Sequence, residues 1–284
     1  MNSRTCRPLS VFFTLILIST SLGAQATKPQ YVDLETIGKR DINKDSVNFS
    51  SMESEMQLGR QAAAELERSI TLADDNDVSA YVDRIAQNIA KNSDAKFPIT
   101  IRVIQSDTMN ATALPGGFIY INSATIKAVD SEAELAFVIA HLVGHVAARH
   151  ATEHSSRGTL MQIAQTTTMT LAGGRLGASI RELPQPGVET QTFAFSRGAV
   201  NEADYLGLIY LYKAGYDSEA AVRFLRKLEE TEASLPKLSS QFKTHPATAD
   251  RIKQMQNHIR LVLPPRERNI NNTQEFDSIK LRVN

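Results

Sequence analysis

His141 and His145 are the first residues whose types and spacing point to chemistry. They stand four positions apart inside a run rich in Ala, Val and Leu. On a helix this spacing places both imidazoles on one face, one turn apart. It is the spacing of the H-E-x-x-H motif, in which two histidines bind zinc and the Glu after the first histidine activates water. Here that residue is Leu142, so the sequence predicts a metal-binding helix that lacks its general base.

A series of predicted elements must position these histidines. Ser131 and Glu134 form a capping box directly before the apolar run, so we expect the central helix to start near Ser131 and to continue past His154. The Leu-Pro-Gly-Gly stretch at residues 114–117 predicts a bend before a strand. The remaining periodicities predict helices at 51–72, 77–92, 160–171, 196–214, 218–230 and 247–260, and strands at 98–105 and 118–121.

The N-terminal residues have the pattern of a signal peptide. A basic start precedes an apolar run at residues 11–22, and Ala24-Gln25-Ala26 offers a small-x-small cleavage pattern. A retained membrane anchor is the alternative, which the run fits less well because a span needs ~20 apolar residues. We therefore expect no stable membrane span after signal removal. The predicted organisation is a signal peptide at 1–26, a flexible lead-in at 27–50, a metalloprotease-like domain at 51–262 and a C-terminal tail at 263–284.

Charge and cysteine content narrow the classes of partner and compartment. The chain has 31 basic and 31 acidic residues, which gives no electrostatic reason to expect nucleic acid as a partner. Its one cysteine is Cys6, inside the predicted signal peptide. The exported chain would therefore contain no disulfide, which favours the bacterial periplasm over a small disulfide-stapled secreted scaffold.

Four motifs, in order, resemble those of one family of gluzincin-type zinc metalloproteases, which includes HtpX, the CAAX prenyl protease, BepA and LoiP. They are the Asn-Ala-x-Ala-Leu-Pro-Gly-Gly strand entry at 110–117, the histidine helix at 134–146, Ser-Arg-x-x-x-x-Glu-Ala-Asp at 196–204, and His-Pro with Arg-Ile at 245–252. The resemblance covers about residues 52–259. It implies an α+β fold that is mostly helical, zincin-like, with a small sheet beside the zinc-motif helix.

Carried over residue by residue, the resemblance implies that His141 and His145 are zinc ligands. It places the general base at Leu142 and the third ligand at Val200, so both acidic residues are aliphatic here. Asp204 matches the carboxylate that orients a ligand histidine, and Arg251 matches the Arg of the last motif. Glu202 lies two residues after Val200, about 200° around the helix, so we expect its side chain to point away from the site.

Two other histidine arrangements remain open. In BepA-like members the His of the His-Pro motif resembles an extra ligand, so His141, His145 and His245 are a candidate three-His zinc site. The alternative is that the first two are packed, hydrogen-bonded relics without metal. Residues 150–154 also fit the H-x-x-E-H pattern. However, His150 is nine residues after His141, about 180° around a continuous helix, so we expect the two pairs not to share a pocket.

The strand after the Gly pair is the candidate peptide-binding element. Zincin proteases bind substrate as an added strand on a free sheet edge, which needs no metal. A Pro beside a strand is typical of an edge position, so we expect a free backbone side there; burial in the core sheet is the alternative. The candidate residues are Gly116, Gly117, Phe118, Ile119 and Tyr120.

The sequence thus predicts an exported, degenerate metalloendopeptidase-family protein. We expect it to bind envelope polypeptides, or to regulate an active relative, without cutting them, and zinc to be absent or weakly bound. The alternative is a zinc-dependent endopeptidase of envelope quality control that uses a rearranged three-His site. A purely structural subunit would show no affinity for unfolded polypeptide.

Overall fold

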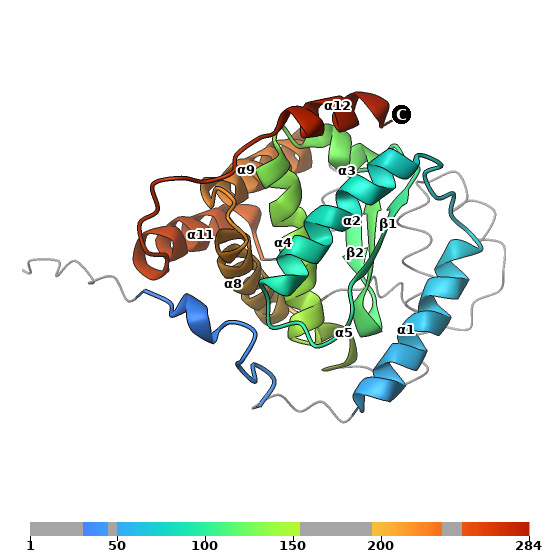
Figure 1. Ribbon diagram of the computed structural model, residues 1–284, viewed down its shortest axis with the longest axis horizontal. Helices are drawn as coiled ribbons and strands as arrows, with labels where there is room; N and C mark the ends of the chain where they lie inside the picture. The colour runs from blue at the N-terminus through green and yellow to red at the C-terminus, as the bar shows by residue number, and fades with distance from the viewer. Residues whose placement is uncertain (1–30, 45–49, 154–194, 235–245, 284) are drawn as a thin grey trace, which may run out of the picture.

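A three-stranded sheet lies between helices in the computed structural model, which describes residues 31–44, 50–153, 195–234 and 246–283. Helix α1 covers one face of the sheet, and α2 and α4 cover the other (Figure 1). The described elements in chain order are η1 (Leu34–Thr36), α1 (Met52–Glu67), α2 (Asn76–Lys91), β1 (Thr100–Ile104), β2 (Ala111–Ala113), η2 (Pro115–Gly117), β3 (Phe118–Asn122), α3 (Ser123–Ala128), α4 (Glu132–Ala147), α5 (His150–Glu153), α8 (Arg197–Lys213), α9 (Glu219–Ser234), α11 (Thr248–Val262) and α12 (Gln274–Arg282).

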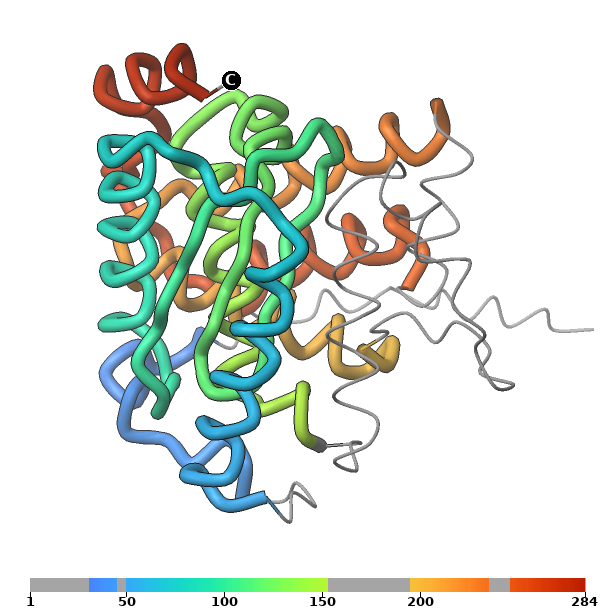
Figure 2. Tube along the Cα trace, turned by 90° about the vertical axis from the view of Figure 1, so that its right-hand side faces the viewer, coloured from blue at the N-terminus to red at the C-terminus, as the bar shows by residue number. Residues whose placement is uncertain are grey.

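Strand β3 is the middle strand of this sheet. It pairs in parallel with β1 and antiparallel with β2, and α1 runs alongside the strands (Figure 2). Because side chains alternate along a strand, Ile119 and Ile121 enter the core shared with α2 and α4, while Tyr120 packs with Leu66 of α1. The prediction of a free backbone side on β3 is therefore wrong, and β2 is an edge strand.

The central helix begins where the sequence predicts and ends earlier. Ser131 caps α4, its Oγ accepting a hydrogen bond from the Glu134 amide at 3.3 Å. The helix stops at Ala147, and Arg149 adopts a left-handed backbone with φ of 57°, which is uncommon for a residue other than Gly. Glu55 of α1 accepts a hydrogen bond from Arg149 Nε at 2.7 Å and stabilises this turn. The expected continuation past His154 is thus wrong.

Two glycines let α8 lie directly against α4. A Cβ added at Gly144 would lie 2.8 Å from the Ala203 carbonyl oxygen, and one at Gly207 would lie 2.8 Å from His141 Cα. Larger residues there would push the helices apart. This close approach brings the acidic residues of α8 beside the histidines of α4.

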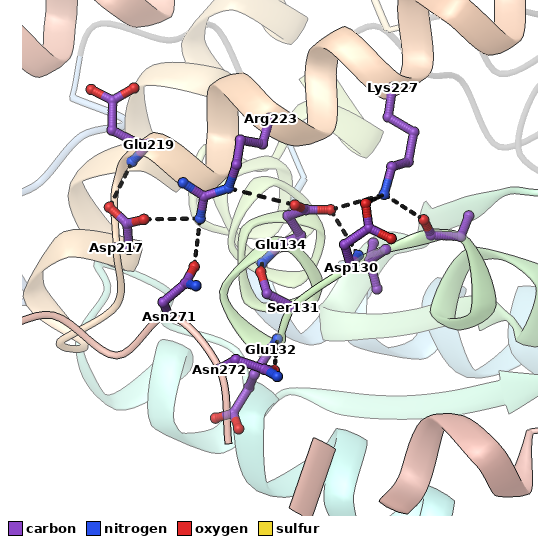
Figure 3. A network of polar contacts seen from close by, with 12 residues as sticks. Asp130, Ser131, Glu132, Glu134, Asp217, Glu219, Arg223, Lys227, Asn271 and Asn272 are labelled. Carbon is purple, nitrogen blue, oxygen red and sulfur yellow. Dashed lines mark hydrogen bonds and ion pairs between the residues drawn. The ribbon is translucent and has the colours of Figure 1, made fainter. Parts of the chain in front are cut away.

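The segments flanking the predicted domain pack against it. In the expected flexible lead-in, Ile37 is buried and Arg40 forms an ion pair with the buried Asp94. In the tail, the Asn272 side chain accepts a hydrogen bond from the Glu132 amide at the start of α4. Figure 3 shows this end of α4, where Glu134 lies between Arg223 and Lys227 of α9. The described residues of both flanking segments therefore include some that pack against the domain.

The observed architecture confirms an α+β fold that is mostly helical with a small mixed sheet. Within the described parts of the chain, no helix combines the length and apolar character needed to cross a membrane. The expected signal peptide lies outside the described residues, as does the helix expected at 160–171.

The packing of α12 predicts that the tail stabilises the domain. Phe276 is fully buried, and its ring lies 6.4 Å from that of Tyr81 on α2. We expect Phe276→Ala to lower the free energy of unfolding in urea by about 3–5 kcal/mol, because it leaves a cavity. Leu281→Ala, at a residue 86% exposed on the same helix, is the control and should change stability by less than about 0.5 kcal/mol. A loss for Phe276→Ala as small as that expected for the control would show that packing of α12 does not stabilise the domain.

Candidate functional site

His141 and His145 lie on one face of α4 with their rings turned toward each other. Their Nε2 atoms are 3.2 Å apart. Two nitrogens bound to one tetrahedral zinc at its usual bond length would be about 3.3 Å apart. The spacing of this imidazole pair therefore fits two ligands of a single metal ion, as the sequence predicts.

Asp204 of α8 lies behind His141, as expected for an orienting carboxylate. Its Oδ1 is 2.9 Å from His141 Nδ1, although the ring N–H is not well aligned with that oxygen. Arg251 of α11 donates to the same carboxylate through Nε at 2.7 Å and Nη2 at 2.8 Å. Burial alone would raise the pKa of Asp204, but the charge and hydrogen bonds of Arg251 outweigh it and hold that pKa below its ordinary value. Asp204 is thus a buried carboxylate anion that touches a candidate ligand.

His150 lies against His145, contrary to expectation. Because the chain turns at Arg149, His150 folds back and its Nδ1 lies 3.0 Å from His145 Nδ1. Its Nε2 lies 3.3 Å from Glu202 Oε2. Glu202 therefore points toward this histidine cluster and not away from it. The rotation argument assumed a continuous helix, and residues 147–149 contain no Gly to signal the turn; His154 lies outside the described residues.

The two positions expected to carry acids are filled by buried aliphatic side chains. Leu142 is 4% exposed and Val200 is completely buried. Among the residues that the structure describes, no three His, Cys, Asp or Glu side chains converge as a metal site. His245, the candidate third ligand, lies outside the described residues. The described part of the site thus offers two imidazoles to a metal and no carboxylate as its third ligand.

A pocket of about 110 Å³ opens beside the histidines. Phe195, which precedes α8, stacks on His145 with ring centroids 3.8 Å apart and covers one face of the imidazole. Apolar side chains dominate the rest of the wall, in which Leu142 occupies the predicted base position. The pocket is lined by Met109, Asn110, Ala111, Thr112, Thr125, Phe137, Val138, His141, Leu142, His145, Phe195, Phe224, Leu228 and Arg251.

The strand that borders this pocket is β2, not the predicted β3. The Asn110 carbonyl accepts a hydrogen bond from the Asn122 amide, and the Leu114 amide donates one to the Phe118 carbonyl. In an antiparallel ladder, Ala111 and Ala113 therefore direct their backbone groups to the other side. The Ala111 amide is taken by the Asn110 side chain at 2.8 Å. Ala113, which is 2% exposed and does not line the pocket, therefore directs its backbone N–H away from β3.

The five residues predicted to bind peptide do not line this pocket. Gly116 and Gly117 are buried and have positive φ, and Ile119 and Tyr120 are buried in the middle strand. A Cβ at Gly116 would lie 2.8 Å from Met56 Cα of α1. Phe118, which begins β3, packs against the cluster beneath α1. The Gly pair thus allows close contact with α1 and with Phe97 and Pro98. Among the described strands, β2 lies at an edge of the sheet.

Comparisons of the sequence with known proteins identify a family. The family model of peptidase family M48 matches residues 76–259. The chain is 26% identical over 231 residues to the beta-barrel assembly-enhancing proteases of Yersinia pestis and of Escherichia coli K12, covering 79% of this chain and 48% and 47% of those proteins. It is 27% identical over 224 residues to the mitochondrial metalloendopeptidase OMA1 of Schizosaccharomyces pombe, covering 75% of this chain and 64% of that protein.

The chain spans about half the length of the beta-barrel assembly-enhancing proteases that it matches. The match to the M48 model covers α2 through most of α11, and so includes the sheet, the histidine pair and the carboxylates of α8. This family is zinc-dependent in general, which agrees with the spacing of the two imidazoles. This chain belongs to peptidase family M48.

Proposed function

We propose that this chain is a non-proteolytic member of the family that binds extended segments of other polypeptides. The observation that carries the proposal is the pair of aliphatic side chains, Leu142 and Val200, at the two positions where the family motifs carry acids. Without the base, water activation loses a contribution of roughly 10²–10⁴ in rate. Without the third ligand, a catalytic metal lacks one of its three protein ligands.

Retention of the cleft supports a binding function. The apolar pocket and the outer edge of β2, as the described residues show it, lie side by side, since Ala111 and Thr112 of β2 line the pocket. An extended peptide would pair with the outward backbone groups of β2 and place one apolar side chain in the pocket. Main-chain hydrogen bonds supply affinity in this mode and pockets supply specificity, so binding does not depend on hydrolysis.

The polypeptides bound are proposed to be exported envelope proteins or an active relative of this chain. The support is the predicted signal peptide together with relatives that are named as beta-barrel assembly-enhancing proteases. We propose a periplasmic location on the support of the same two observations.

Binding and cleavage can be measured in one experiment with fluorescein-labelled casein. We expect saturable binding by fluorescence polarisation, and no casein fragments with added zinc or with chelator. Ala113→Pro removes the outward N–H of β2 and should weaken binding at least about tenfold. Ala113→Gly keeps the N–H at the same position and is the control, with affinity expected to stay within about threefold.

If Ala113→Pro binds casein as tightly as the control variant, β2 is not the docking edge. Absence of binding by the unaltered chain would contradict the proposal and favour a purely structural subunit. Folding of both variants is checked by their thermal transitions, which should stay cooperative.

The alternative is a zinc endopeptidase that uses His141, His145 and His245. The paired Nε2 atoms, with Asp204 behind one of them, favour it. When bound, zinc would supply an activated water and polarise the scissile carbonyl. Chelator-sensitive cleavage of casein that His141→Ala abolishes would establish this alternative and overturn the non-proteolytic proposal.

A further inference from the structure

We propose that Leu142 is a specificity-determining residue: it forms part of a pocket that accepts one aliphatic side chain of a bound peptide. This inference rests on the proposed function, because it names the kind of side chain that the pocket selects. The two aliphatic replacements differ in their surroundings. Val200 is completely buried and does not line the pocket, whereas Leu142 lines it and is 4% exposed. Leu142 is thus placed where it can contact a ligand.

The wall around Leu142 is mostly apolar and comes from two helices and a strand. Phe137 of α4 and both Phe224 and Leu228 of α9 line the pocket, and the two Phe rings have centroids 6.1 Å apart. Ala111 lines it from β2. A side chain of a peptide paired with β2 would therefore exchange water for contacts with apolar surface, which is favourable for an apolar side chain.

The polar groups in this wall are largely used inside the protein. Thr125 Oγ1 accepts a hydrogen bond from the Asn110 backbone amide at 2.9 Å and donates one to the Asn110 carbonyl at 2.8 Å. Asn110 Oδ1 accepts from the Ala111 amide. The charge of Arg251 is balanced by Asp204, to which it donates two hydrogen bonds. A polar or charged occupant would therefore lose hydrogen bonds to water without gaining equivalent partners, which is costly.

The size of the pocket favours an aliphatic side chain over a large aromatic one. Its volume is about 110 Å³, and an apolar cavity of about 150 Å³ can hold a benzene molecule. The side chains of Leu, Ile and Met have fewer non-hydrogen atoms than benzene, whereas the indole of Trp has more. We therefore expect the three aliphatic side chains to enter the pocket and Trp to be excluded.

The residue type at position 142 decides how well such an occupant is accepted. A Glu there, as in the family motif, would put a carboxylate in the pocket wall, and an aliphatic occupant would have to desolvate it at a cost. Leu142 removes that cost and adds apolar contact area. The loss of the base is thus also a gain of surface for recognition.

Short fluorescein-labelled peptides of Ser and Thr, with one varied residue at the centre, test this preference by fluorescence polarisation. With the unaltered chain, we expect the peptide with central Leu to bind at least about tenfold more tightly than the one with central Asn, because the two side chains have a similar shape and only Leu gains by burial. The peptide with central Trp should bind at least about tenfold more weakly than the Leu peptide, because Trp overfills the pocket.

Leu142→Ala enlarges the pocket and should produce a gain that partial unfolding cannot mimic. We expect the Trp peptide to bind this variant about threefold to tenfold more tightly than it binds the unaltered chain, and the Leu peptide to bind it more weakly. Leu142→Val, a smaller truncation that disturbs folding less, should shift the ratio of the two affinities in the same direction. Leu281→Ala, at the exposed residue of α12, is the control and should leave this ratio unchanged.

The outcomes separate this inference from the proposed function. Equal affinity of the unaltered chain for the Leu and Asn peptides, with casein still bound, would overturn the inference alone. An unchanged ratio of Leu to Trp peptide affinity in both Leu142→Ala and Leu142→Val would also overturn it. Absence of binding to casein and to every peptide would overturn the inference together with the proposed function.

Discussion

Replacing Arg251 with Met is expected to lower the free energy of unfolding by about 3–5 kcal/mol. Arg251 donates two hydrogen bonds to Asp204, and the two side chains are 6% and 8% exposed. Methionine fills similar space but leaves the carboxylate buried without its guanidinium, and an unpaired buried charge is costly. Urea denaturation followed by circular dichroism measures the change.

Two variants show whether the loss comes from the unpaired charge. Arg251→Met combined with Asp204→Leu removes both charges, and should recover at least half of the lost stability because such pairs are often nearly neutral when replaced together. Arg260→Met, at an exposed residue of the same helix, is the control and should have an effect below about 0.5 kcal/mol. A loss below about 1 kcal/mol for Arg251→Met would mean that Asp204 is not buried as an anion.

Most long helices were predictable because they have a local signal in the sequence, whereas α3 and α12 were not predicted. Met52–Glu67, Asn76–Lys91 and Arg197–Lys213 agree with their predicted ranges to within a few residues at most ends, since apolar periodicity and caps are properties of the segment itself. The order of the strands was not predictable in this way. Strand β2 has only three residues, Ala-Thr-Ala, which carry no strand pattern of their own. Without β2, the strand at 118–122 was assigned to the edge.

The site shows the same division between local and long-range information. Leu142 and Val200 are visible in the sequence as departures from a motif, and Asp204 matches the orienting carboxylate of the same family motif. His150 and Glu202 depend on a turn at Arg149 that the distant Glu55 stabilises. Residues 147–149 contain neither Gly nor Pro, so the sequence predicts a straight helix there. Contacts between residues 94 positions apart cannot be read from periodicity.

Restoring an acid at position 200 is expected to make the stability of the chain depend on zinc. On the antiparallel helices α4 and α8, Gly207 touches His141 and Ala203 touches Gly144, so Val200 lies one further turn along α8, toward the level of His145. Val200→Glu without metal buries an unpaired carboxylate and should lower the melting temperature. With zinc at 100 times its dissociation constant, binding should return about 2.7 kcal/mol. Val200→Gln, which lacks the negative charge, is the matched control and should respond to zinc much less.

Adding Leu142→Glu to Val200→Glu is expected to raise the rate of casein cleavage by about 10²–10⁴ over Val200→Glu alone, because it supplies the missing general base. Leu142→Glu alone should give no cleavage, since the metal would still lack its third ligand. Cleavage should disappear with chelator and with His145→Ala. Zinc-dependent stability without cleavage in the double variant would place the defect in the cleft, where Phe195 stacks on His145 and narrows access to the metal. If zinc changes the stability of neither Val200→Glu nor the double variant, then Val200 does not face the imidazole pair. The hypothesis that this site has lost two acidic residues would then be wrong.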